Sequence, residues 1–93
     1  MTLDISTFGK AISDPTRVAM LAYLREAGAM SCRDLSGRFK LSQPTFSYHV
    51  KMLRDAGLIE VTKEGTSHVY TFYKRAWKDL GVNVDNFLNN IKI

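Results

Sequence analysis

The sequence of 93 residues lacks the features on which secreted and membrane proteins depend. Its one cysteine, Cys32, excludes a disulfide within the chain, as is usual for proteins in a reducing cytoplasm. No apolar run approaches the ~18 residues needed to span a bilayer, and residues 1–8 are too polar for a signal peptide. We therefore expect a cytoplasmic protein without membrane insertion.

The residue patterns of enzymes are also missing. The sequence has no Ser/His/acid set, no glycine-rich loop to hold a phosphate and no convincing pair of acidic residues. We therefore expect no enzyme, no catalytic residue and no cofactor. No repeat or linker divides the chain, so residues 1–93 are expected to form one domain, and the small core of so short a chain favours a dimer.

Basic residues are concentrated in one part of the chain. The net charge of the whole chain is +4. Residues 31–54 contain five basic residues against one acidic residue, so this segment alone equals the excess of the whole chain. Such a patch favours a polyanionic partner, and the alternative is a solvated surface stripe.

Hydrophobic spacing and capping residues predict a mainly α protein with a small β-hairpin. Asp14, with Pro15 after it, is expected to begin one helix, and Ser31 and Ser42 two others. The expected elements are helices over 4–12, 15–27, 31–39 and 42–57, strands over 58–62 and 68–73 around a turn at 63–67, and a helix near the C-terminus. In the second helix the expected inward residues are Val18, Leu21 and Leu24, with Tyr23 as a further candidate.

The helix expected over residues 42–57 has one apolar stripe and one polar face. On a helical wheel, Phe46, Val50 and Leu53 fall on one side. The opposite face carries small or flat hydrogen-bonding side chains and little acidic charge before Asp55. An ordinary amphipathic surface helix has this pattern too, but the face also suits the base edges of a DNA major groove.

The residues that we expect to contact DNA follow from this placement. The candidates for reading bases are Gln43, Thr45, Ser47 and Tyr48. The candidates for contacting the backbone are Arg33, Arg38, Lys40, Ser42, His49, Lys51, Arg54, Lys63 and Thr66. The last two lie at the tip of the hairpin, which is expected to act as a wing or, alternatively, only to cap the core. For His49 a bond within the protein is an equal alternative.

Two motifs with this spacing give the chain a family resemblance. Residues 13–17 read SDPTR, and residues 41–50 read LSQPTFSYHV, followed by LRDAGLI at 53–59. Over roughly residues 5–75 the chain resembles the ArsR/SmtB family of winged helix–turn–helix repressors. The resemblance implies the order α-α-α-α-β-β-α, a homodimer formed by the first and last helices, and repression from an inverted-repeat operator.

The dimer interface is expected at the apolar residues of the two terminal helices, whose combined surface is large for a lone small domain. These residues are Ile5, Phe8, Trp77, Leu80, Val84, Phe87 and Leu88.

Metal sensing is not expected, although many members of the family carry a Cys-x-Cys pair before the Asp-Leu of the third helix. Here the two ligand positions are Ser31 and Arg33, and Cys32 falls between them. A guanidinium repels a cation. Near the C-terminus Asp79 and Asp85 occur without a histidine, and two carboxylates alone are poor zinc ligands.

Two alternatives to a simple DNA-binding repressor follow. In one, an unidentified small-molecule or protein effector, or oxidation of Cys32, controls DNA binding, whereas Cys32 is otherwise a small packing residue. In the other, the winged helix is a protein-interaction module that binds no DNA.

Overall fold

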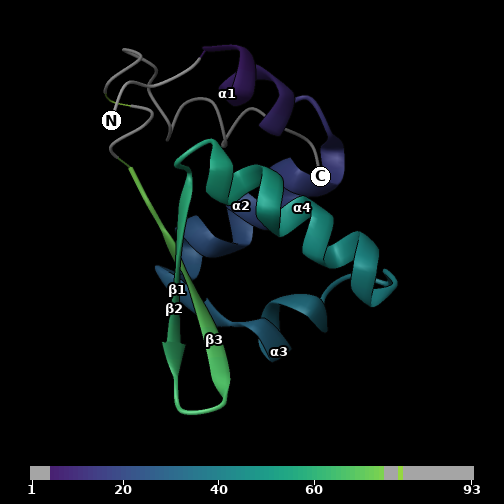
Figure 1. Cartoon of the computed structure of the whole chain (residues 1–93), viewed down its shortest axis with the longest axis vertical. Coiled ribbons are helices and arrows are strands. Elements are labelled where there is room, and N and C mark those ends of the chain that lie inside the picture. The colour runs from purple at the N-terminus through teal and green to yellow at the C-terminus, as the bar shows by residue number, and fades with distance from the viewer. Residues whose placement is uncertain (1–4, 75–77, 79–93) are drawn as a thin grey trace.

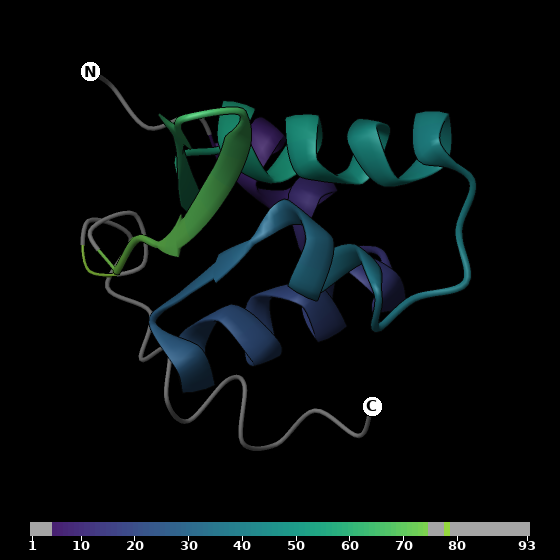
Figure 2. The same ribbon diagram turned by 90° about the horizontal axis from the view of Figure 1, so that it is seen from below.

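The computed structural model describes residues 5–74 and residue 78, and the account below is confined to them. Four helices pack with a three-stranded sheet (Figure 1). The helices are α1 (Ile5–Ala11), α2 (Pro15–Ala27), α3 (Cys32–Ser36) and α4 (Gln43–Asp55), and the strands are β1 (Ala29–Ser31), β2 (Ile59–Glu64) and β3 (Ser67–Phe72). Figure 2 shows α4 and the hairpin on one side of the molecule and α2 on the other.

The helices α2, α3 and α4 each begin with the capping residue that the sequence predicts. The carboxylate of Asp14 accepts from the backbone N–H of Thr16 at 2.7 Å, and Pro15 is the first residue of α2. The hydroxyls of Ser31 and Ser42 accept from backbone N–H groups at the starts of α3 and α4. These bonds satisfy donors that have no partner inside the helix, so the chain begins its helices at defined residues.

The third helix is shorter than predicted. We expected it to continue to Phe39, but α3 ends at Ser36 and Gly37 caps it. Single-turn bonds from the N–H of Arg38 to Leu35 and from the N–H of Phe39 to Ser36 carry the chain onward. Leu35 is fully buried and Phe39 packs against the core, as their spacing predicts.

The sheet contains one strand that the sequence pattern did not predict. The order is β1-β3-β2, with Met30 opposite Tyr70 and Val61 opposite Tyr70 on the other side. Three residues are too few to show an alternating pattern, and β1 exists because β3 offers it a backbone edge. The hairpin was predicted, but its strands reach Glu64 and Ser67, which leaves a two-residue turn with Gly65 at φ +62°.

The core lies between the helices and the sheet. Phe46, Val50 and Leu53 are all buried, which confirms the predicted stripe of α4. The other buried apolar residues are Phe8, Ala11, Val18, Ala19, Met20, Leu21, Leu24, Leu35, Ala56, Leu58, Ile59 and Tyr70. Tyr23 is 39% exposed, so its candidacy as an inward residue was wrong.

The interface residues predicted in the first and the last helix differ in what the structure says of them. Phe8 is 5% exposed and belongs to the core of its own chain, so it is not a surface residue as the interface prediction requires, whereas Ile5 is 71% exposed. The predicted C-terminal helix, with interface residues Trp77, Leu80, Val84, Phe87 and Leu88, lies outside the described residues. In the part of the chain that is described, no helix has the length and apolar character needed to cross a bilayer.

Candidate nucleic-acid interface

The exposed face of α4 begins at its capped N-terminus. The Ser42 hydroxyl accepts from the backbone N–H of Thr45 at 3.3 Å and donates to the Thr45 hydroxyl at 2.9 Å. Both side chains are exposed, and the bond between them fixes their orientation. Gln43 is exposed beside them, and Pro44 occupies the first turn. The end of α4 that carries partial positive charge is therefore lined by exposed polar groups.

Further along α4, the predicted polar face is on the surface. Ser47, Tyr48 and Lys51 are exposed, while Phe46 and Val50 anchor the opposite side of the helix. Tyr48 is 54% exposed and its ring centroid lies 5.8 Å from that of His49. The exposed face therefore presents an amide, hydroxyls and an ammonium group, and these groups suit base edges and phosphates.

Asp55 pairs with the two basic side chains at the C-terminal end of this face, Lys51 and Arg54. Its Oδ2 lies 2.6 Å from the Nζ of Lys51, and its Oδ1 lies 3.9 Å from the Nε of Arg54. The hydrogen bond from Lys51, followed by the charges of Lys51 and Arg54, lowers the pKa of Asp55 below its ordinary value. Two of the basic residues expected to contact the DNA backbone thus share one carboxylate.

His49 lies inward rather than on the exposed face. Its side chain is 8% exposed, and its Nδ1 lies 2.9 Å from the Nη1 of Arg17 in α2. Of the two alternatives for His49, the structure therefore has the bond within the protein. The sequence marks Arg17 only as part of the SDPTR motif, because a bond between residues 32 positions apart leaves no local signal.

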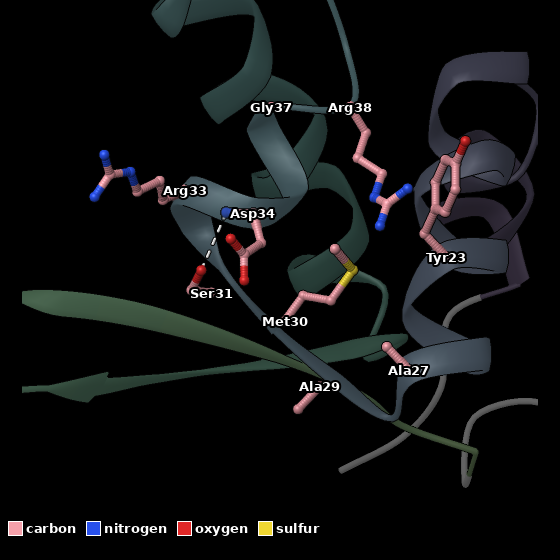
Figure 3. A pocket seen from close by; sticks show the side chains of 9 residues that line it. All are labelled: Tyr23, Ala27, Ala29, Met30, Ser31, Arg33, Asp34, Gly37 and Arg38. Carbon is pink, nitrogen blue, oxygen red and sulfur yellow. Dashed lines mark hydrogen bonds between the residues drawn. The ribbon is translucent and has the colours of Figure 1, made fainter.

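A groove separates α3 from the C-terminal half of α2 (Figure 3). It has a volume of ≈ 940 Å³ and is lined by Tyr23, Ala27, Ala29, Met30, Ser31, Arg33, Asp34, Gly37 and Arg38. The Arg38 guanidinium lies 4.9 Å from the centroid of the Tyr23 ring, and that ring meets Phe39 edge-on at 5.8 Å. Figure 3 shows the two arginine side chains pointing away from each other, with Arg38 beside Tyr23. The two arginines expected to contact phosphates therefore occupy different surroundings.

The hairpin carries the two predicted wing residues close to its turn. Lys63 belongs to β2, opposite His68 of β3, and Thr66 is in the turn itself. All three residues are exposed. Figure 1 shows the turn projecting beyond the helices, in the position that a wing requires. Lys40, in the connection before α4, is also exposed.

Residues 31–33, where many members of the family carry a cysteine pair, contain one thiol, that of Cys32. Ser31 uses its hydroxyl to cap α3, Arg33 is exposed, and Cys32 is half-buried against the core. Burial, and then a hydrogen bond with Cys32, raises the pKa of the Tyr70 hydroxyl. Among residues 5–74 and 78, no three His, Cys, Asp or Glu side chains come together in a group able to hold a metal ion.

Comparison with known proteins agrees with this geometry. A family model described as a helix-turn-helix domain matches residues 12–62. The arsenical resistance operon repressor of Staphylococcus xylosus is 35% identical over 82 residues, which cover 88% of this chain and 78% of that protein. The transcriptional repressor SdpR of Bacillus subtilis is 34% identical over 80 residues, which cover 86% of this chain and 88% of that protein.

Solved structures give the same result. The crystal structure of an ArsR family transcriptional regulator matches with a TM-score of 0.75 at 27% identity, over 91% of this chain and 88% of the other. The winged arrangement of helices and hairpin is thus shared with that regulator. The chain belongs to the ArsR/SmtB family of winged helix–turn–helix transcriptional regulators.

Proposed function

We propose that this protein is a sequence-specific transcriptional repressor that binds double-stranded DNA as a homodimer in the cytoplasm. The observation that carries the proposal is the two-sided character of α4. Its buried stripe fixes the helix to the core, and its other face exposes Gln43, Thr45, Ser47 and Tyr48. The names of the two relatives, both repressors, support the regulatory outcome.

In the proposed complex, α4 enters the major groove. Gln43 is suited to a bidentate bond with adenine, and Ser47 and the methyl group of Thr45 suit base edges and a thymine methyl. The residues proposed to contact the backbone are Arg33, Arg38, Lys40, Ser42, Lys51, Arg54, Lys63 and Thr66. His49 is left out because its Nδ1 is bonded to Arg17.

A homodimer would give the proposed repressor two copies of α4. In helix–turn–helix dimers the two recognition helices lie about 34 Å apart, one turn of DNA, and this spacing matches an inverted repeat. The proposed interface includes Ile5 at the start of α1, which is exposed within its own chain. Its other proposed members are in the C-terminal segment.

The proposal is tested by measuring the affinity of the protein for the DNA upstream of its own gene. A scrambled duplex of the same composition serves as the control. We expect a preference for the upstream duplex, and a steep loss of affinity with salt because phosphate contacts release counterions. Equal affinity for both duplexes at every salt concentration would contradict sequence-specific binding and would favour the protein-interaction alternative.

A second candidate function is control of that binding by an effector. The groove between α2 and α3 favours it, because its volume falls in the range of small-molecule sites and two arginines border it. A panel of small organic anions should then include one that raises the melting temperature of the wild type but not of Tyr23→Ala, and that releases the DNA. Oxidative control instead predicts that peroxide weakens DNA binding by the wild type but not by Cys32→Ser.

A further inference from the structure

We propose that Arg17 and His49 are positioning residues for DNA binding: they hold the rotation of α4 relative to α1 and α2, so His49 acts through Arg17 and not through a phosphate. This inference rests on the proposed function. It concerns the orientation of the helix that reads DNA, and its test separates the two.

The guanidinium of Arg17 is bonded to three different places. Its Nε donates to the carbonyl of Ala11 at 2.9 Å, and its Nη2 donates to the carbonyl of Lys10 at 2.8 Å. Its Nη1 lies 2.9 Å from the Nδ1 of His49 and 3.9 Å from the carboxylate of Asp14. Arg17 is 7% exposed, so these bonds form away from water. One side chain therefore joins the end of α1, the start of α2 and the middle of α4.

The chemistry of the pair fixes the state of the imidazole. An arginine side chain only donates hydrogen bonds and keeps its proton. His49 must therefore accept at Nδ1, and its ring is neutral with the proton on Nε2. A protonated ring has no acceptor at Nδ1 and would place a second positive charge beside the guanidinium.

Few charged groups lie close to the imidazole ring of His49. Of the elements packed on α4, α2 and its N-cap bring Arg17 and Asp14 close to the ring. The end of α1 contributes only backbone carbonyls, which accept from Arg17, because the side chain of Lys10 is exposed. The charged residues of β2 are all exposed. The Asp14 carboxylate lies 3.9 Å from the same Nη1 of Arg17, and it also accepts from the first N–H groups of α2.

This contact bears on DNA reading because rotation of α4 decides which side chains face outward. Successive residues of a helix are 100° apart, so a modest rotation would turn Ser47 away from a base that it contacts. Phe46, Val50 and Leu53 set the rotation through apolar packing, which tolerates small adjustments, whereas a hydrogen bond between two buried planar groups is directional. Because α1 also belongs to the proposed dimer interface, the Arg17–His49 bond of each protomer connects that interface to the protomer's own α4.

The test compares two substitutions of similar bulk at one position. His49→Asn keeps an acceptor near the place of Nδ1, whereas His49→Leu removes it and leaves the Nη1 of Arg17 without its partner. We expect His49→Leu to lose about tenfold or more in affinity for the upstream duplex, and His49→Asn to stay within about threefold of the wild type. Affinity for the scrambled duplex should change little in either variant. All proteins are measured at a temperature where circular dichroism shows them folded.

A pH series supplies a readout that a merely structural role would not move, and it remains decisive if His49→Leu does not fold. As the pH falls, the wild type should lose affinity for the upstream duplex relative to His49→Asn, because a protonated His49 cannot accept the bond from Arg17. A histidine that contacts phosphate would do the opposite and gain affinity. His68 is present in both proteins, so it cannot account for a difference between them.

The outcomes are distinct. If the wild type does not prefer the upstream duplex, the proposed function fails. If it does prefer that duplex, and His49→Leu binds as tightly as the wild type or acid strengthens wild-type binding relative to His49→Asn, the positioning role is overturned.

Discussion

The ring of Phe46 in α4 lies 6.2 Å from the ring of Tyr70 in β3, with an angle of 45° between the two planes. Both residues are buried, at 2% and 6% exposure. This contact joins α4 directly to the central strand of the sheet. The helix and the base of the hairpin therefore share one core, and losing either ring should destabilise both.

Phe46→Ala is expected to lower the free energy of unfolding by about 3–5 kcal/mol, because it removes a large buried ring and leaves a cavity. Thermal or urea unfolding measures the change. Tyr48→Ala is the matched control, since the Tyr48 ring is 54% exposed and its loss should cost little stability. An unchanged melting temperature in Phe46→Ala would mean that α4 is rotated differently from the structure.

Gln43→Ala and Arg38→Ala should weaken DNA binding in different ways. Removing a bidentate contact should cost about 1–3 kcal/mol at one base pair and relax the preference there. Arg38→Ala should weaken binding to every sequence and lower the salt slope by about 1. Affinity measurements over single-base variants of the bound site distinguish the two. A uniform loss in Gln43→Ala would show that Gln43 does not read bases.

Asp55→Asn is expected to strengthen DNA binding. The substitution removes the carboxylate that lies 2.6 Å from Lys51 and 3.9 Å from Arg54, so both cations become available to phosphates. Affinity at low salt should rise for the specific and the scrambled duplex alike, and the salt slope should steepen. The pair is exposed, so stability should hardly change. Weaker binding would indicate that the Lys51–Asp55 bond itself holds Lys51 in place for the DNA.

Asp14 should make stability depend on acid. Partial burial would raise its pKa, but the N–H bonds from Arg17 and Thr16 and the charge of Arg17 outweigh burial and lower it. A lowered pKa means that the carboxylate stabilises the folded state above its ordinary pKa, near ~3.9, and that this stability is lost as the pH falls through the folded value.

The comparison with Asp14→Asn isolates this charge, since asparagine also caps helices well. Between about pH 5 and pH 2 the wild type should lose more free energy of unfolding than Asp14→Asn does. Urea unfolding at a series of pH values measures the difference. Parallel curves would show that the charge of Asp14 contributes nothing.

Two glycines should respond to alanine in opposite directions. Gly28 ends α2 at φ +82°, where an alanine is strained by about 1–2 kcal/mol. Gly9 lies inside α1, and apart from its own helix backbone and chain neighbours no atom of the described residues lies within 4 Å of an added Cβ. Alanine there should stabilise the fold by up to about 1 kcal/mol. Thermal unfolding of the two variants tests both signs, and a stabilised Gly28→Ala would contradict the backbone geometry at the end of α2.

Local chemistry explains what could be predicted from the sequence. Asp14, Ser31 and Ser42 each bond to N–H groups two or three residues away, so their capping role is visible in a short window. The apolar stripe of α4 follows from helical spacing in the same way. Both kinds of signal need only the order of neighbouring residues.

What could not be predicted depends on partners far along the chain. Met30 becomes part of a strand because Tyr70 lies beside it, and Arg17 is buried where His49 accepts a hydrogen bond from it. Tyr23 has helical spacing compatible with the core, yet it lies under the guanidinium of Arg38 at the surface. Each of these outcomes is decided by tertiary contacts that no local pattern contains.

The short strand β1 pairs with only the inner part of β3, so the two ends of the hairpin differ in how many strands support them. Beside Val69–Thr71 the ribbon has a strand on each side of β3, but Ser67 and His68 have a neighbour only in β2. A two-stranded ribbon alone has little intrinsic stability, whereas three strands resist bending. In the proposed complex, the outer end, with Lys63 and Thr66, can therefore bend to follow the DNA backbone, while the inner end keeps its place beside α4.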